Sequence, residues 1–228
     1  MDFILDPSLV LYLPLGKLDG ASFVSRDAYG HLCTVTGTVW GAHGRYFDGA
    51  DDYVNASAAI NTIQDLSVGT IMAWFNCDLV NYHNILTASD LSDPSSDLYL
   101  ACLQKTGGDW RLALFIREGR GSYLRVYSTN NVIDETWHLG AVAVSAKGNQ
   151  LYLDGKAEVG DYLTGDSSTQ RFFNTVQNID SLLIGIGRDS GGYEADFKGY
   201  IGEVWMYNRP LTPLEIQHIY LLTKWRYR

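Results

Sequence analysis

The sequence predicts an all-β protein, with two antiparallel sheets packed as a sandwich and a short C-terminal helix. Two observations indicate this fold class. Apolar residues recur with a period of two rather than 3.6 along most of the chain, and turn residues follow about every ten residues without βαβ alternation. Since no Ser/Pro-rich linker or long charge run divides the chain, we predict a single domain over residues 1–228.

The predicted strands lie between short turns, in which Gly and Asn supply the positive φ that tight bends need. The alternating segments are residues 8–15, 70–77, 97–104, 110–119, 122–129, 136–145, 149–157, 181–188 and 199–208. Aromatic residues fit pleated, half-buried strands, and they make up 13% of the chain, which supports this assignment.

Two helical segments are predicted. Residues 58–66 can form a short turn of helix. In the segment TPLE, Thr212 is the N-cap and Glu215 the N3 residue of a capping box with proline at N1, which predicts a closing helix over about 212–224. The cationic end of the chain, KWRYR, suits a helix C-terminus, and docking of this tail on a neighbouring protein is the alternative.

The charge of the chain restricts its partners. The net charge is −9 and the pI about 4.9, so we expect no nucleic-acid partner, because nucleic acid requires a cationic face. The apolar run at the start is too short to cross a bilayer and lacks a cationic leader. We therefore expect no membrane insertion and no signal peptide, with synthesis in the cytoplasm. Display on a virion or cell surface as part of an assembly is left open.

The three cysteines, Cys33, Cys77 and Cys102, form an odd set with no CxxC spacing. Cys77 and Cys102 lie in apolar alternation, as small core residues do. We do not expect a disulfide framework, and one bridge with one remaining thiol stays open.

Four segments in combination resemble one known family. They are LVLYLPLGKLDGASFVSRDAYGHLCTVTG, GRYFDGADDYVNAS, TWHLGAVAVSAKGNQLYLDGK and LLIGIGRDSGGYEADFKGYIGEVWMYNRPLTPLEIQHIY. In this order they are similar to the laminin-G-like, pentraxin-like jelly rolls of the concanavalin A-like lectin/glucanase superfamily. The resemblance spans nearly the whole chain. It implies a jelly-roll sandwich with about six or seven strands in each sheet, the last strand beside the first, and a small closing helix.

The resemblance also implies a structural calcium ion. The family often carries one Ca²⁺ near the join of the first loop and the last strand, held by loop carbonyls and carboxylates. On this basis the candidate ligands are Asp27 and Glu203. Where many relatives read I-D-E, this chain reads Ile201-Gly202-Glu203, which removes one carboxylate. We expect no other cofactor.

The segment YFDGADDYV sets Asp48, Asp51 and Asp52 between two aromatic-flanked strands. Asp48-Gly49 is a turn signal, and Asp51 can accept backbone N–H groups in the loop, so we interpret these acids as structural. An EF-hand is excluded, because its ligand spacing is absent.

The sequence contains no hydrolase motif. Retaining glycosidases on this sandwich typically present E-x-D-x-E, which brings two carboxyl groups to about 5–5.5 Å, whereas the strand acids of this chain are isolated. G-x-S-x-G and H-E-x-x-H are also missing. We expect His83 in a solvated polar loop and His138 at a packing position. The chain is therefore predicted not to be an enzyme.

The strand pair at 110–119 and 122–129 presents an arginine- and tyrosine-rich face opposite an apolar one. Pairing across the sheet would gather these side chains into one exposed patch. The candidate ligand-binding residues are Arg117, Tyr123, Arg125 and Tyr127, on the face that also carries Arg111 and Phe115, with Tyr99 and Trp74 on neighbouring strands and Tyr82 and Tyr193 on loops. Arg and Tyr also alternate on sheet surfaces for cross-strand packing alone, and that interpretation stays open.

Two functions are compatible with these features. The first is a non-catalytic, lectin-like recognition module that binds a glycan, which is the commonest non-catalytic role in the family that the chain resembles. The alternative is a structural protein of a virion, tail fibre or surface layer, which would use the same fold to bind protein subunits, including further copies of itself as a homo-oligomer.

Overall fold

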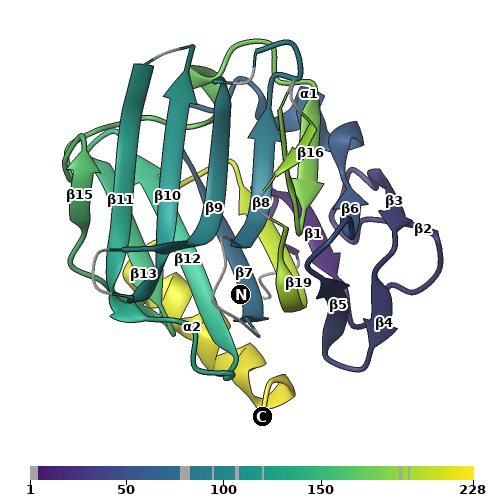
Figure 1. Cartoon of the computed structure of the whole chain (residues 1–228). Helices are drawn as coiled ribbons and strands as arrows, with labels where there is room; N and C mark the ends of the chain where they lie inside the picture. Colours follow the sequence, from purple (N-terminus) through teal and green to yellow (C-terminus); the bar gives the residue numbers. More distant parts are fainter. Residues whose placement is uncertain are drawn as a thin grey trace.

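The computed structural model describes residues 5–77, 83–93, 95–105, 108–119, 121–189, 192–194 and 196–228, with the backbone alone at 188, 189 and 192–194. Within these residues the strands form two large antiparallel sheets that enclose one apolar core (Figure 1). The predicted all-β sandwich with a C-terminal helix is confirmed.

The first large sheet has eight described strands. In spatial order they are β14 (Lys156–Ala157), β13 (Gly148–Leu153), β12 (His138–Ser145), β7 (Gly69–Cys77), β19 (Lys198–Tyr207), β5 (Gly44–Asp48) and β4 (Val39–Gly41), and β1 (Leu9–Pro14) pairs with β19. The implied contact between the first and last strands is thus confirmed. In their register Leu13 lies opposite Val204, and Pro14 opposite Glu203.

The second large sheet has nine described strands and faces the viewer in Figure 1. In spatial order they are β15 (Asp161–Thr164), β11 (Gly121–Asn131), β10 (Trp110–Glu118), β9 (Asp97–Gln104), β8 (His83–Ser89), β16 (Ser181–Ile184), β6 (Tyr53–Asn55), β3 (Leu32–Thr36) and β2 (Ser22–Val24). A separate hairpin joins β17 (Gly187–Asp189) to β18 (Gly192–Glu194).

Both sheets are larger than the six or seven strands expected. The additional strands include short pieces at the sheet edges, such as β2 and β4, in stretches without clear alternation. The predicted strand over 149–157 is also divided by a turn into β13 and β14. The helical turn expected over 58–66 is also shorter, with η2 (Ser57–Ala59) followed by α1 (Ile60–Ile63). Another 3₁₀ turn is η3 (Phe173–Thr175).

The inner faces of the two sheets supply the core. Leu112 and Leu114 of β10 and Leu124 and Val126 of β11 are fully buried, as their alternation predicts. Removal of such apolar surface from water is the main stabilising contribution to a fold of this kind. The opposite face of β10 and β11 is therefore free to carry polar and aromatic side chains.

The helix α2 (Pro213–Thr223) covers the outer face of the eight-stranded sheet and continues into η4 (Lys224–Arg226). The predicted capping box is present, since the Thr212 N–H donates to the Glu215 carboxylate at 2.7 Å and the Glu215 N–H donates to Thr212 Oγ1 at 3.3 Å. Ile216 and Ile219 pack into an apolar cluster with Trp205. In the described part of the chain, the helices are too short or too polar to cross a bilayer.

The expectation for His83 is wrong. This residue begins β8 and is fully buried, rather than lying in a solvated loop. Its Nδ1 accepts a hydrogen bond from the Lys198 N–H at 3.1 Å, and its ring meets the edge of Phe197. The polar residues next to His83 in the sequence predicted a loop, although the strand already begins at His83.

Candidate ligand-binding face

The arginine- and tyrosine-rich surface lies on the outer face of the nine-stranded sheet. Tyr99 is opposite Phe115, and Phe115 is opposite Arg125. On the other side of Tyr99 the row continues to Thr87 on β8. Residues directly opposite each other share a face, because side chains alternate along each strand. We call Thr87, Tyr99, Phe115 and Arg125 the central row.

The rings and the cation of the central row are in contact. The Tyr99 and Phe115 rings meet edge to face, with centroids 4.9 Å apart. The Arg125 guanidinium carbon lies 5.3 Å from the Phe115 ring centroid and 5.4 Å from that of Tyr127. These cation–π contacts orient the guanidinium. The central row therefore combines an apolar surface with one fixed positive charge.

Arg117 shares this face, but its charge is neutralised. Its Nε donates to Asp97 Oδ1 at 2.9 Å, and its Nη2 donates to Asp97 Oδ2 at 2.6 Å. A bidentate pair of this kind leaves little capacity for another anion. By contrast, no described residue forms an ion pair with Arg125, whose buried Nε has no hydrogen-bond partner. Arg125, rather than Arg117, is the cation available to a ligand.

Strand β8 adds a column of polar groups to the face. Asn84 Oδ1, Thr87 Oγ1 and Ser89 Oγ are buried and have no hydrogen-bond partner within the described part of the chain, and the three residues are 5%, 3% and 1% exposed. A buried polar group without a partner is costly, so such a column indicates a surface that a ligand or ordered water completes. The residues predicted from the sequence do not include this column, although Thr87 and Ser89 alternate with the core residues Leu86 and Ala88.

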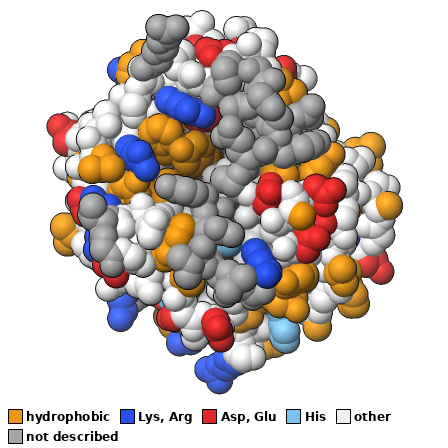
Figure 2. Space-filling view, viewed as in Figure 1, with side chains coloured by type: hydrophobic (Ala, Val, Ile, Leu, Met, Phe, Trp, Pro, Cys, Tyr) orange, Lys and Arg blue, Asp and Glu red, His pale blue; other side chains and the backbone are white. Residues whose placement is uncertain are grey.

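The remaining hairpin candidates differ in their exposure. Tyr123 is 39% exposed. The guanidinium carbon of Arg171 lies over its ring, 4.8 Å from the ring centroid. Tyr127 lies on the predicted face but is only 1% exposed, so the expectation of an exposed side chain is wrong there. Its ring is covered by Arg125 and by Lys105, which lies 4.9 Å from the centroid. Figure 2 shows hydrophobic side chains with basic ones beside them on this face.

Three further candidates do not join the central row in the described residues. Trp74 lies on β7 of the other sheet, 2% exposed, and stacks on Tyr227 at a centroid distance of 4.5 Å, so its assignment to the patch is wrong. Tyr82 lies outside the described residues, as does the side chain of Tyr193. Aromatic type alone could not show which sheet Trp74 belongs to.

The two calcium candidates have oxygens that already bind protein donors. The Asp27 carboxylate accepts the backbone N–H groups of Tyr12 and Tyr29, both at 2.9 Å, and of Gly30 at 3.2 Å. The Glu203 carboxylate accepts hydrogen bonds from two tyrosine hydroxyls and pairs with Arg226 at 2.6 Å. Calcium needs six to eight oxygen ligands that converge on one point. These two residues therefore do not fit a calcium site, and we do not carry this ion into the proposed function.

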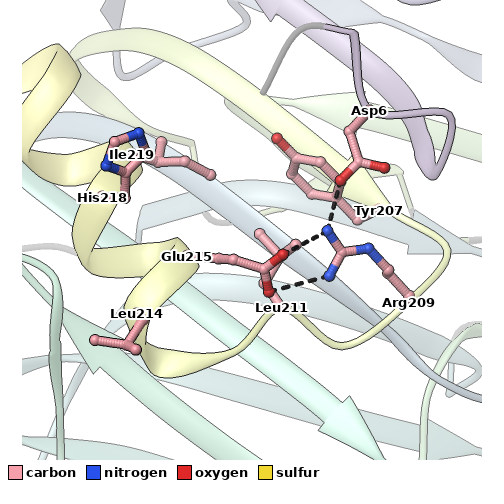
Figure 3. Close-up of a pocket in the computed structure, with 8 residues that line it drawn as sticks. All are labelled: Asp6, Tyr207, Arg209, Leu211, Leu214, Glu215, His218 and Ile219. Carbon is pink, nitrogen blue, oxygen red and sulfur yellow. Dashed lines mark hydrogen bonds and ion pairs between the residues drawn. The ribbon is translucent and has the colours of Figure 1, made fainter. Parts of the chain in front are cut away.

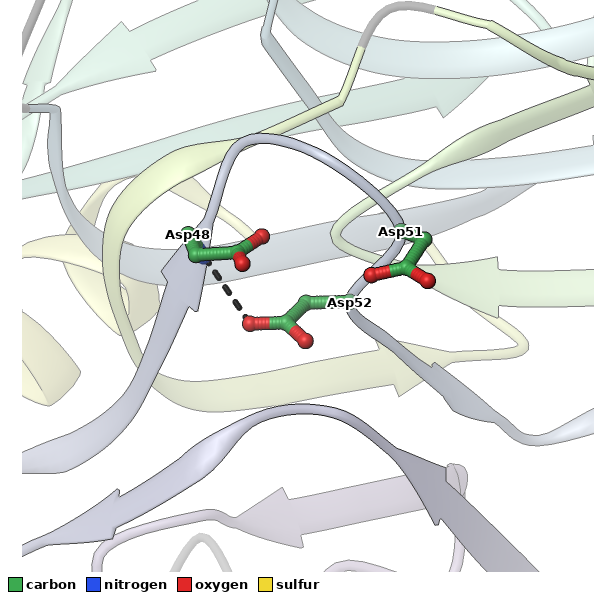
Figure 4. A group of neighbouring side chains, drawn as sticks. All are labelled: Asp48, Asp51 and Asp52. Carbon is green, nitrogen blue, oxygen red and sulfur yellow. Dashed lines mark hydrogen bonds between the residues drawn. The ribbon is translucent and has the colours of Figure 1, made fainter.

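The three acids of the segment YFDGADDYV hold the turn between β5 and β6 (Figure 4). The Asp48 N–H donates to Asp52 Oδ2 at 2.9 Å, and the Ala50 N–H donates to Asp48 Oδ1 at the same distance. The acid that accepts from the backbone across the turn is Asp52 rather than Asp51. Burial and the charges of Asp48 and Asp51 raise the pKa of Asp52. One carboxylate oxygen from each of the three acids lies within 4.8 Å of the other two, a spacing that could hold a metal ion. Because these acids accept hydrogen bonds from the backbone of the turn, we interpret the cluster as structural.

A cavity of about 320 Å³ lies between α2 and the end of β19 (Figure 3). The polar side of this cavity is formed by Arg209 and two carboxylates. The Arg209 Nη2 donates to Glu215 Oε1 at 2.7 Å and to Asp6 Oδ2 at 2.5 Å. The hydrogen bonds with Arg209 lower the pKa of Glu215 to about 2. This ion cluster ties the N-terminal segment to α2, so we interpret it as structural.

His138 occupies a packing position, as predicted, between two carboxylates. Its Nδ1 lies 2.9 Å from Asp154 Oδ2, and its Nε2 lies 3.1 Å from Asp134 Oδ1. Burial opposes protonation, but the hydrogen bonds and charges of Asp154 and Asp134 outweigh it and raise the pKa of His138. His138 therefore joins the loop before β12 to the β13–β14 turn.

We expect the protein to lose stability as the pH rises above neutrality. Because the pKa of His138 is higher in the folded than in the unfolded state, its contribution is complete below the unfolded value of about 6.5 and disappears as the pH passes the folded value. Urea unfolding between pH 6 and 9 would show this slope. His138→Gln should flatten it, whereas a matched change of the exposed His43 to Gln should leave it unchanged. An identical slope in His138→Gln would contradict the assignment.

Comparisons with known proteins agree with this architecture. A family model described as the concanavalin A-like lectin/glucanases superfamily matches residues 48–217. A search of curated protein sequences returned no match.

Two solved structures illustrate the similarity of fold. The carbohydrate-binding module CBM40 of the Ruminococcus gnavus IT-sialidase, bound to α2,3-sialyllactose, is 16% identical with a TM-score of 0.63, covering 81% of this chain and 97% of that one. Trypanosoma rangeli sialidase in complex with sialic acid is 17% identical with a TM-score of 0.66, covering 98% of this chain and 34% of that one. This chain thus spans about a third of the T. rangeli enzyme.

Proposed function

The chain belongs to the concanavalin A-like lectin/glucanases superfamily, and we propose that it is a non-catalytic module that binds a glycan on the outer face of the nine-stranded sheet. The site is centred on the central row. The observation that carries the proposal is the composition of this row. Its aromatic pair lies between a cation and a hydroxyl, and no described residue forms an ion pair with the cation or a hydrogen bond with the hydroxyl.

Each part of the row suits one part of a sugar. The Tyr99 and Phe115 rings offer an apolar surface for the C–H groups of a pyranose. The Thr87 and Ser89 hydroxyls, although these residues are only 3% and 1% exposed, have no hydrogen-bond partner among the described residues and can bond a sugar hydroxyl or a bridging water. The four residues of the row lie on adjacent strands about 4.8 Å apart, so the row spans roughly 14 Å, which suits a short oligosaccharide.

An anionic glycan is favoured over a neutral one. Arg125 has no ion pair among the described residues, and a guanidinium binds a carboxylate with two parallel hydrogen bonds. The R. gnavus module of similar fold binds sialyllactose, which carries such a carboxylate, and this supports the choice of ligand class. The carboxylate of Asp97 on the same face is held by Arg117, which agrees with a binding rather than a catalytic role.

Arg125→Ala is expected to weaken binding of an anionic glycan at least tenfold, about 1.4 kcal/mol, because a charge-assisted hydrogen-bond pair is lost. The measurement is a glycan array with sialylated and neutral oligosaccharides, followed by calorimetric titration of the strongest ligand. Arg125→Lys should recover part of the affinity, since it keeps the charge but not the bidentate geometry.

The matched control is Arg26→Ala, which removes an exposed arginine far from the row in sequence and should leave binding unchanged.

Thr87→Ala tests the other end of the row, with an expected loss of affinity of about threefold to tenfold because one hydrogen bond is lost. The proposal is wrong if the unmodified chain binds no glycan, or if Arg125→Ala binds as tightly as the unmodified chain.

The alternative, a structural assembly protein, has one observation in its favour. Leu214, Leu221 and Trp225 on α2 and η4 are 76%, 51% and 65% exposed, which is more apolar surface than a helix needs in water. Neither similar structure named above is a virion or tail-fibre component, so we do not propose that setting. A native mass measurement showing closed rings or fibres, together with an array without signal, would favour the assembly role.

A further inference from the structure

Two of the three cysteines meet across the core, although they lie on different sheets. Cys77 is the last residue of β7 in the eight-stranded sheet, and Cys102 lies on β9 in the nine-stranded sheet. Both are fully buried, and their Sγ atoms are 3.5 Å apart. The third, Cys33 on β3, donates instead to the His31 carbonyl at 3.6 Å. The sequence placed both residues in the core but could not show that they are neighbours.

We propose that Cys77 and Cys102 are a site of covalent modification, at which a small-molecule disulfide converts the two thiols into one bond between the sheets. The thiolate of one cysteine attacks the external disulfide, which forms a mixed disulfide and releases one small thiol. The second cysteine, as its thiolate, then attacks the protein sulfur of the mixed disulfide and releases the other small thiol. Two protein thiols are thus oxidised, and one external disulfide is reduced to two thiols.

The geometry favours this pair over any pair with Cys33. The two sulfurs must approach by about 1.5 Å to reach the bond length of about 2.05 Å, a movement within the reach of side-chain rotation and a small shift between sheets. Cys33 is further protected, because burial raises the pKa of its thiol to about 12 and suppresses the reactive thiolate.

Burial makes the reaction dependent on local opening. Cys77 lies at the end of its strand, where opening requires less than complete unfolding. Once formed, the bond would close a loop of 24 intervening residues and fasten β9, which carries Tyr99, to the opposite sheet. The oxidised protein should therefore resist heat better than the reduced one, which suits a recognition module that works in an oxidising medium.

The experiment treats the full chain with excess oxidised glutathione, blocks remaining thiols by alkylation, and maps peptides without reduction. We expect one cross-link between the peptides that carry Cys77 and Cys102, one alkylated site at Cys33, and an intact mass lower by two hydrogen atoms before alkylation. The melting temperature should rise on the order of 5–10 °C and return after reduction.

Cys33→Ser is the matched control and should form the same cross-link with the same thermal shift. Cys77→Ser and Cys102→Ser should each abolish it. The peptide map of the unmodified chain decides the question if either of these variants fails to fold. The proposal is overturned if three alkylated cysteines persist after oxidation at temperatures that allow local opening, or if the cross-link includes Cys33.

Discussion

Replacing Arg226 by alanine is expected to lower the free energy of unfolding by about 3 kcal/mol, because it leaves a buried carboxylate without its cation. Glu203 is only 3% exposed on β19. Its Oε1 accepts from the Tyr12 hydroxyl at 2.5 Å and pairs with Arg226 Nη1 at 2.6 Å, and its Oε2 accepts from the Tyr227 hydroxyl at 3.1 Å. Two neutral hydroxyls cannot compensate for loss of the guanidinium.

Urea unfolding at pH 7 measures this effect. Arg228→Ala removes an exposed arginine two residues away and should change the free energy of unfolding by less than about 0.5 kcal/mol. The double variant Glu203→Gln with Arg226→Ala should be more stable than Arg226→Ala alone, because no uncompensated charge remains. If Arg226→Ala has the same free energy of unfolding as the unmodified chain, the ion pair with Arg226 does not stabilise the buried Glu203 carboxylate.

The two sheets could be predicted because their signal is local. Alternation in residues 110–119 and 122–129 shows which side chains face the core, and the buried Leu114 and Val126 bear this out. The capping box of α2 is equally local, since Thr212 and Glu215 bond each other. Such features depend on residues a few positions apart, which the sequence displays directly.

The candidate site was predicted only in part, because its chemistry depends on distant partners. Arg117 and Arg125 have the same residue type and the same alternation, and what distinguishes them is Asp97, twenty residues from Arg117. A register shift between Ile116 and Arg117 also changes which residues lie opposite each other. The polar column of β8 comes from a strand whose position beside β9 follows from the tertiary pairing.

The C-terminal tail shows the same limit. Its cationic and aromatic residues are compatible with a helix end or with a surface that docks a neighbour, and the structure shows that part of the tail packs against the outer face of the eight-stranded sheet of the same chain. Tyr227 stacks on Trp74, and Arg226 reaches Glu203, 23 residues away. Burial of the Tyr227 side chain and the nearby charge of Glu203 raise the pKa of the Tyr227 hydroxyl, so the tyrosine remains a hydrogen-bond donor at neutral pH.

Replacing Gly202 by aspartate, the residue that many relatives carry at this position, is expected to destabilise this protein by at least about 3 kcal/mol. A Cβ on Gly202 would lie 2.5 Å from Cε1 and 2.7 Å from the hydroxyl oxygen of Tyr227, closer than atoms pack. The new side chain would therefore displace Tyr227, and its carboxylate would lie next to Glu203 in the chain. The departure from I-D-E is thus explained by the tail, which occupies the space that an aspartate would need.

The melting temperature should fall by roughly 6–12 °C in Gly202→Asp, and by less in Gly202→Ala, which adds the Cβ without the charge. Combining Gly202→Asp with Tyr227→Ala should cost less than the sum of the two changes, because the second removes the atoms that the first displaces. Each melt is repeated with added Ca²⁺. If Gly202→Asp is as stable as the unmodified chain, or gains stability specifically with Ca²⁺, then a carboxylate fits beside Glu203 and the tail does not replace it.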